Sequence, residues 1–158
     1  MSLIKIKKFA AMVITVVAVS CGGADTGEQQ SGAHFQEETG KLGNPNNPVQ
    51  NKGIGPVKSL TLGSLDQAMA DDGQKIYTAK CSACHKAEER FIGPAPKGIM
   101  ERRTPEWIMN MILNPEEMIK NDPIAKQLLI DFNLAPMANQ HLTQDEARKI
   151  LEYFRTLK

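Results

Sequence analysis

The sequence lacks the features that mark several large classes of protein. Its 158 residues carry a net charge of +1, without the basic excess that is typical of nucleic-acid-binding proteins. No apolar stretch reaches the roughly 20 residues that a helix needs to cross a bilayer. Three cysteines are too few for a disulfide-rich scaffold, and the glycines have no period of three, which excludes collagen. What remains is one small domain with attachments.

The N-terminus has the layout of an export signal. Three lysines within the first eight residues precede a short apolar run, residues 9–19, and small residues then lead to Cys21. This layout resembles a bacterial lipoprotein signal, whose cysteine is acylated and becomes the first residue of the mature protein. The resemblance implies a signal peptide at 1–20, lipidation of Cys21, and a cell-envelope protein that is anchored to a membrane and faces the periplasm. Ordinary secretory cleavage, with Cys21 left as a free thiol, is the alternative.

Residues 22–65 differ in composition from the rest of the chain. They hold nine of the twelve glycines and a single aromatic residue, Phe35, and turn formers cluster at 44–48 and 53–56. Such a segment cannot bury enough apolar surface to offset the entropy lost on ordering. The composition therefore predicts a flexible tether before a folded domain at 66–158. With the lipidation that the signal resemblance implies, 21–65 is expected to be a lipidated N-terminus and flexible linker.

Helix-start signals recur through residues 66–158. Most pair an N-cap residue with a following proline or form a capping box, and apolar residues then follow at intervals of three and four. No convincing alternating strand is found, so the sequence predicts an all-α domain. The predicted helices begin at Asp66, Thr104-Pro105, Asp122-Pro123 and Thr143, and Asn114-Pro115 ends the second of them.

The chemistry is concentrated in the run Cys81-Ser82-Ala83-Cys84-His85. A Cys-x-x-Cys-His run is the attachment signature of a c-type haem. The spacing lets both sulfurs bond the vinyl groups of one porphyrin edge, and it carries His85 under the iron. A structural zinc site would need further ligands, a thioredoxin-like dithiol would be expected among strands, and a plain disulfide leaves His85 without a role. The motif therefore predicts one covalent haem c.

The second axial position of the iron has two candidates. Met137 lies in an irregular segment, 134–139, where Pro136 stiffens the approach, whereas the other methionines of the domain lie in or beside predicted helices. A Met137 thioether opposite His85 favours Fe(II) and raises the reduction potential. The rival is His141, which would lower it. Because either choice fills both axial positions, the sequence predicts an electron-transfer protein without a small-molecule substrate rather than an enzyme.

The segment 66–158 resembles a class I monohaem cytochrome c. In that family a glycine, followed four residues later by an aromatic residue, lets the first helix cross the last one closely. Gly73 and Tyr77 have this spacing here. A glycine inside a helix costs about 1 kcal/mol relative to alanine, so its presence is understandable if another helix approaches at that point. The resemblance implies a small helical domain wrapped around its haem.

A second match to the family follows the haem motif. Gly93-Pro94 corresponds to the family's Gly-Pro turn, whose proline packs on the proximal histidine and whose carbonyl region can fix its ring. The resemblance therefore implies that Pro94 belongs to the haem site and sets the tautomer of His85. The departure from the family is Ala138, because many small bacterial members have a proline directly after the ligand methionine.

The resemblance also implies a role and its partners. We expect a one-electron carrier with transient donor and acceptor proteins in a periplasmic respiratory chain, ending at a terminal oxidase or a nitrogen-oxide reductase. No nucleic-acid partner is expected, because the domain is nearly neutral. The alternative is a haem-based sensor or enzyme in which a labile Met137 leaves the iron open to peroxide, NO or CO.

Two further groups of residues have either a haem-related or an ordinary interpretation. Arg102 and Arg103 lie just before the helix of Trp107, where they could neutralise a haem propionate or simply be solvated. The lysines near the motif could surround an exposed haem edge or be ordinary surface charges. These lysines are Lys80, Lys86 and Lys97.

Overall fold

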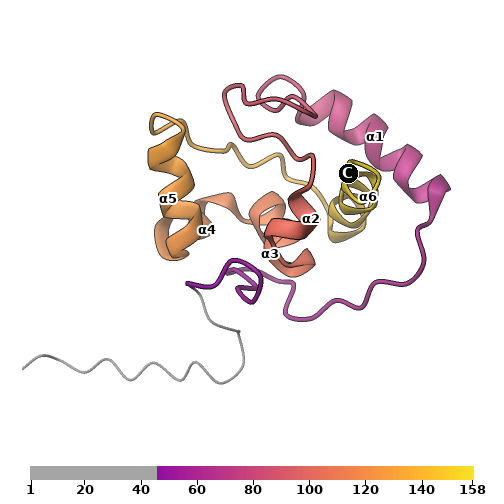
Figure 1. The fold of residues 1–158 in the computed structure, drawn as a ribbon, viewed down its shortest axis with the longest axis horizontal. Helices are drawn as coiled ribbons and strands as arrows, with labels where there is room; N and C mark the ends of the chain where they lie inside the picture. The colour runs from indigo at the N-terminus through magenta and orange to yellow at the C-terminus, as the bar shows by residue number, and fades with distance from the viewer. Residues whose placement is uncertain (1–45) are drawn as a thin grey trace, which may run out of the picture. The chain divides into compact units, whose positions relative to one another are not determined.

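The computed structural model describes residues 46–158 (Figure 1). The expected signal peptide, Cys21 and the expected tether up to residue 45 lie outside the described residues. No helix within 46–158 is both long enough and apolar enough to cross a membrane.

Every regular element of the described residues is a helix, which confirms the all-α prediction. Each expected N-cap side chain accepts a hydrogen bond from the first turn of its helix, and the capping box is present at Thr143 and Glu146. The helices are α1 (Gln67–Lys80), α2 (Ile99–Arg102), α3 (Pro105–Leu113), α4 (Pro115–Asn121), α5 (Pro123–Asp131) and α6 (Gln144–Phe154).

Two of these helices were not expected from the sequence. Asn114-Pro115 ends α3 as predicted, but the same proline is the first residue of α4. A proline stops the helix before it and suits the first position of the next, so one signal has both outcomes. The other unexpected helix, α2, is only a single turn.

The first and last helices cross closely (Figure 1). Gly73 lies at the crossing, where a Cβ atom would come closer than 3.0 Å to the backbone carbonyl of Lys149. One turn later, the Tyr77 ring packs on Tyr153 and Phe154, with centroids 5.3 and 5.8 Å apart. The expected role of the glycine and of the aromatic residue is therefore observed: both allow α1 to pack directly on α6.

The carboxylate of Glu152 is fully buried on α6. It accepts hydrogen bonds from Arg148 at 2.5 Å, from Arg155 at 2.6 Å and from the backbone N–H of Asp66 at 2.8 Å. Burial alone raises the pKa of this carboxyl, but the Asp66 N–H and the two guanidinium groups outweigh burial and hold the pKa below its ordinary value of 4.5. The charged form of Glu152 therefore stabilises the fold.

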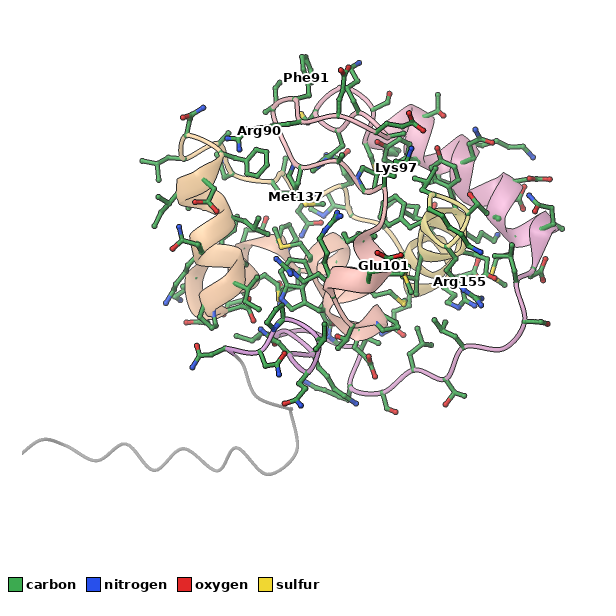
Figure 2. The ribbon with its side chains drawn as sticks, viewed as in Figure 1. Arg90, Phe91, Lys97, Glu101, Met137 and Arg155 are labelled. Atoms are coloured by element: carbon green, nitrogen blue, oxygen red, sulfur yellow. The ribbon has the colours of Figure 1, made fainter. Side chains whose placement is uncertain are left out.

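Acid should remove the contribution of Glu152 to stability. Since its folded-state pKa lies below the ordinary value of 4.5, the contribution is complete above that pH and is lost as the pH falls through the folded-state pKa. We expect Glu152→Gln to lower the free energy of unfolding at neutral pH by about 2 kcal/mol and to weaken its fall in acid. Urea unfolding at neutral and several acidic pH values tests this. The control, Glu101→Gln, changes an exposed carboxylate (Figure 2) and should follow the unmodified protein.

Residues 51–65 form an ordered strap, which corrects the expectation of a flexible tether for this part of the chain. The strap passes α3 before it reaches α1 (Figure 1). Val57 is buried, and its backbone N–H donates to Oδ1 of Asn110 at 2.9 Å. The amide of Asn110 donates in turn to the carbonyls of Lys52 and Val57, and the Leu60 N–H donates to Glu106.

The partners of the strap explain why its composition was misleading. The strap has three glycines, one proline and no aromatic residue, but most of its aliphatic side chains pack against the core. Its backbone groups also bind two buried polar side chains of α3, Asn110 and Glu106. The ordering entropy is therefore offset by contacts with a distant part of the sequence. The folded domain begins by residue 51 rather than at residue 66.

Candidate functional site

A largely apolar cavity opens between the helices and contains the side chains that the sequence singled out. Its lining comes from all six helices, α1 to α6, and from the segments that follow α1 and α5. The predicted haem-site residues all contribute to it, although they come from three separate parts of the chain. These residues are Cys81, Cys84, His85, Pro94 and Met137.

The cysteines are presented by a tight turn at the end of α1. The Cys81 N–H closes the last turn of the helix on the Tyr77 carbonyl at 2.8 Å, and the N–H groups of Cys84 and His85 both donate to the Cys81 carbonyl. Both thiols are free. The turn therefore brings two thiols and one imidazole to the same wall of the cavity.

The Cys81 thiol lacks the lowered pKa of a reactive redox cysteine. Burial, and then the neighbouring Cys84, raises the pKa of the Cys81 thiol to about 11. Thiol oxidoreductases instead depend on a lowered pKa that supplies the reactive thiolate. A zinc site is not supported either, since no group of three or more metal-binding side chains occurs among residues 46–158.

The imidazole of His85 is held in one orientation. Its Nδ1 lies 2.8 Å from the Pro94 carbonyl oxygen, which can only accept, so Nδ1 carries the proton and Nε2 keeps its lone pair. The Tyr77 hydroxyl donates to the His85 carbonyl at 2.6 Å and holds the backbone. Gly93 lies directly against the ring, because a Cβ atom there would be 2.7 Å from Nδ1. This arrangement leaves Nε2 available to bind a metal ion.

A methyl group at residue 93 should displace the histidine ring. We expect Gly93→Ala to reduce the yield of haem-loaded, histidine-ligated protein on the order of tenfold, as is usual when the support of a metal ligand is disturbed. Haem stain per unit of protein and the ferrous spectrum measure this. Gly63→Ala is the matched control, because nothing lies within 4 Å of a Cβ atom there. Equal yields from the two variants would contradict the prediction.

The two candidates for the second axial ligand lie in different surroundings. Met137 lines the cavity and packs against the hydrophobic core, and Figure 2 shows it inside the domain between α5 and α6. His141 is exposed and is not part of the lining. The structure therefore brings the thioether, and not the second imidazole, into the cavity that His85 lines.

The cavity also suits the acidic groups of a haem. Arg103 lines it, and its Nε is the only buried side-chain nitrogen or oxygen of the described residues without a hydrogen-bond partner. A buried donor requires an acceptor, and a haem propionate would supply a carboxylate. Arg102, by contrast, donates to the backbone carbonyls of Lys97 and Ala95. The thiols, the imidazole, the thioether and this free donor together fit a covalent haem.

The basic residues near the motif do not share one role. Lys80 lines the cavity, Lys86 lies over the Phe91 ring at 5.0 Å, and Lys97 forms an ion pair with Glu88 at 3.1 Å. The expected group of three lysines is therefore divided between the cavity wall and the surface.

The sequence analysis missed several buried polar residues near the site. Asp122 was recognised only as an N-cap, and Glu106 and Asn110 were not singled out, although all three are buried. Asp122 follows the usual pattern of a helix start, so nothing in the sequence indicates that it also binds Asn51 and Trp107. Their spacing along the chain carries no signal, because their partners are remote in sequence.

Comparisons with known proteins agree with this geometry. The sequence model of the family described as Cytochrome c matches residues 70–158. Cytochrome c from Rhodothermus marinus has 43% identity and a TM-score of 0.63, over 65% of this chain and 89% of that chain. An engineered form of it, bound to a carbene intermediate, has 43% identity and a TM-score of 0.60, over 65% and 89%.

A more distant structure gives the same result. The cytochrome c domain of the pp3183 protein from Pseudomonas putida has 27% identity and a TM-score of 0.50, over 53% of this chain and 85% of that chain. No curated protein matches the chain.

Proposed function

This chain belongs to the cytochrome c family and binds haem c, and we propose that His85 and Met137 ligate the haem iron while Cys81 and Cys84 form its thioether bonds. The proposed function is one-electron transfer between protein partners. The observation that carries it is the convergence on one apolar cavity of two thiols, an imidazole with a free Nε2 and a thioether.

Each of these residues would contribute separately to electron transfer. The haem, when bound, exchanges one electron between Fe(III) and Fe(II). The hydrogen bond to Pro94 keeps His85 oriented, and a Met137 thioether favours the reduced iron. The apolar lining excludes water, which disfavours the more highly charged oxidised state. If His85 and Met137 both bind the iron, no position would be left for a substrate, and the carrier would have no enzymatic activity.

The surface beside the cavity suits a transient protein partner. Phe91 and Ile92 are about half exposed, and Lys86 lies over the Phe91 ring. The guanidinium carbon of Arg90 lies 4.1 Å from the centre of the Phe132 ring. This contact connects the segment that carries Phe91 to the end of α5 (Figure 2). Glu88 and Glu89 are exposed in the same segment, so the charges around these apolar side chains are mixed in sign. A small face of exposed apolar side chains favours a short-lived complex with a partner protein.

The cellular setting follows from the N-terminal sequence alone. The layout around Cys21 supports export, acylation and a membrane anchor that faces the periplasm. In that setting the carrier would take electrons from a quinol-oxidising complex and pass them to a terminal oxidase or a nitrogen-oxide reductase. Mass spectrometry of the mature N-terminus tests the anchor, because an acylated Cys21 is required and an unmodified one would contradict it.

The optical spectrum tests the proposed function. The chain is produced in a host that attaches c-type haem and measured oxidised and reduced, with haem stain on the denatured band. We expect covalent haem, sharp reduced bands and the weak far-red band of methionine-ligated ferric haem. A high-spin spectrum without that band would contradict ligation by Met137, and a chain without covalent haem would contradict the haem site itself.

A second candidate function rests on the backbone around Met137. Leu134 and His141 have φ angles of +59° and +52°, a region that costs an ordinary residue about 1–2 kcal/mol. Within 46–158, no backbone hydrogen bond joins residues 136–142 to another part of the domain. Side chains hold this stretch instead, since Met137 packs against the core and Asn139 donates to Glu116 at 3.3 Å. Displacement of the methionine would open the iron to a small ligand, and the engineered relative does hold a carbene. Prompt spectral change of the ferrous protein under CO would support this sensor or enzyme, and no change would exclude it.

A further inference from the structure

A buried carboxylate outside the haem ligands contacts the wall of the cavity. Asp122 is 2% exposed, and its Oδ1 accepts a hydrogen bond from the indole Nε1 of Trp107 at 3.1 Å. The same oxygen accepts the backbone N–H groups of Ile124 and Ala125, which begin α5. Its second oxygen, Oδ2, accepts the side-chain amide of Asn51 at 2.6 Å. Asp122 is therefore held from three directions.

Asn51 is the strap residue that reaches this cluster. It is 3% exposed, and while its Nδ2 donates to Asp122, its Oδ1 accepts the N–H of Gly53 at 2.7 Å. Both ends of the amide are thus used, which fixes its orientation. The Asn51 carbonyl accepts the Thr104 hydroxyl at 2.6 Å, and Thr104 caps the helix that carries Trp107.

These contacts hold Trp107 at two points. Its indole is bound through Asp122, and its backbone N–H donates to the Thr104 hydroxyl at 3.1 Å. Asn51 contacts both Asp122 and Thr104, so one strap residue closes a ring of hydrogen bonds around the tryptophan. The strap precedes residues 70–158, which are the part that the family's sequence model matches.

Trp107 connects this hydrogen-bonded cluster to the cavity. It lines the cavity together with Arg103, whose guanidinium lies over the indole ring at 5.2 Å. Burial, and then Arg102, lowers the pKa of Arg103, whereas the charge of Asp122 opposes both. The position of Asp122 therefore bears on the geometry of the tryptophan, and its carboxylate helps to stabilise the guanidinium that carries the unpaired Nε.

We propose that Asn51 and Asp122 are positioning residues of the haem site, which fix the Trp107–Arg103 wall and make the strap a functional part of the electron carrier. This inference rests on the proposed function, because the wall faces a haem only if the cavity holds one. Neither residue touches the cavity itself.

The proposal predicts that two substitutions shift the reduction potential in opposite directions. Asn51→Ala removes the amide that covers Asp122 and admits water beside Trp107, which favours the oxidised iron and lowers the reduction potential. Asp122→Asn removes a buried negative charge and so favours the reduced iron, which raises the potential. A purely structural role would give no such pair of opposite signs.

The double variant Asn51→Asp/Asp122→Asn tests the hydrogen bond between residues 51 and 122 while one negative charge is kept in the cluster. In the double variant the donor and the acceptor trade places, while each residue keeps an oxygen for its other partners: the Gly53 N–H at position 51, and Trp107, Ile124 and Ala125 at position 122. We expect it to restore the near-ultraviolet circular dichroism of Trp107, which either single change should disturb. That signal is specific, because Trp107 is the only tryptophan of the chain.

The experiment compares these three variants with Val57→Ala in the haem-loaded protein. Val57 is a buried strap residue whose backbone contacts go to Asn110, so its truncation should lower the free energy of unfolding by about 1 kcal/mol without moving the potential or the Trp107 signal. Reduction potential, the haem absorption spectrum, near-ultraviolet circular dichroism and urea unfolding are measured for all four.

The outcomes separate this inference from the proposed function. Opposite potential shifts with an unchanged haem spectrum, and a Trp107 signal restored in the double variant, support it. The inference is overturned if Asn51→Ala moves the potential no further than Val57→Ala, or if the folded double variant keeps a disturbed Trp107 signal. If Asn51→Ala does not fold, two variants still test the inference. These are the double variant, through its Trp107 signal, and Asp122→Asn, through its reduction potential. An unmodified protein without low-spin covalent haem would instead contradict the proposed function.

Discussion

Replacing Met137 by alanine should lower the reduction potential and open the iron to external ligands. The thioether stabilises Fe(II), and the choice of axial ligand spans roughly 0.8 V across haem proteins, so we expect a fall on the order of 0.1 V or more. The far-red band of the ferric protein should disappear, and the ferrous protein should bind CO at once. Potentiometry and the CO difference spectrum measure the two effects.

His141→Ala is the matched control for this substitution. His141 lies four residues further along the same loop but is exposed and outside the cavity lining, so its removal should leave the spectrum and the potential unchanged. If the spectrum instead changed in His141→Ala and stayed intact in Met137→Ala, the histidine would be the ligand. The position of Met137 in the cavity would then reflect core packing alone.

Replacing Gly73 by alanine should destabilise the protein by about 2 kcal/mol or more. In an isolated helix the change would stabilise by about 1 kcal/mol, but here the new Cβ atom would come closer than 3.0 Å to the Lys149 carbonyl. That atom belongs to the backbone of α6, so relief requires the two helices to separate, at a cost of about 3 kcal/mol or more. Urea or thermal unfolding measures the loss.

The sign of this effect is what makes it informative. Gly63→Ala serves as the control, because the added methyl group meets nothing within 4 Å, and it should be neutral or slightly stabilising. A neutral Gly73→Ala would mean that α1 and α6 can move apart without loss. A change in the haem spectrum of Gly73→Ala is also expected, since the same helix carries Tyr77 and the turn that begins at Cys81.

Local signals in the sequence predicted the helix starts well. Asp66, Thr104, Asp122 and Thr143 each cap a helix, because an N-cap side chain binds N–H groups only two or three residues away. The limit of such signals appears at Asn114-Pro115, which marks both the end of α3 and the start of α4. A local pattern does not state whether the chain leaves a helix or begins another.

The strap shows where composition fails as a guide. Residues 51–65 contain three glycines, one proline and no aromatic residue, as a tether would, yet Val57 is buried and α3 binds the backbone beside it. Composition measures what a segment can bury by itself, whereas this segment is ordered by Asn110 and Glu106, about 50 residues away, as their separations of 53 and 46 show. Only the folded chain brings these groups together.

The candidate site also has features that the sequence predicts and features that only the folded structure decides. The run Cys81–His85 indicates its chemistry by spacing alone, since both sulfurs must bond one porphyrin, and the family follows from it. The choice between Met137 and His141 depends on which side chain lines the cavity. Arg103 and Arg102 both line it, and they differ in that a buried nitrogen of Arg103 has no hydrogen-bond partner. The sequence by itself determined the family, the cofactor and the helix starts, because these depend on neighbouring residues. The tertiary structure decided the extent of the domain, the residues that line the cavity and the place of the strap, because hydrogen bonds and packing between distant residues exist only after folding.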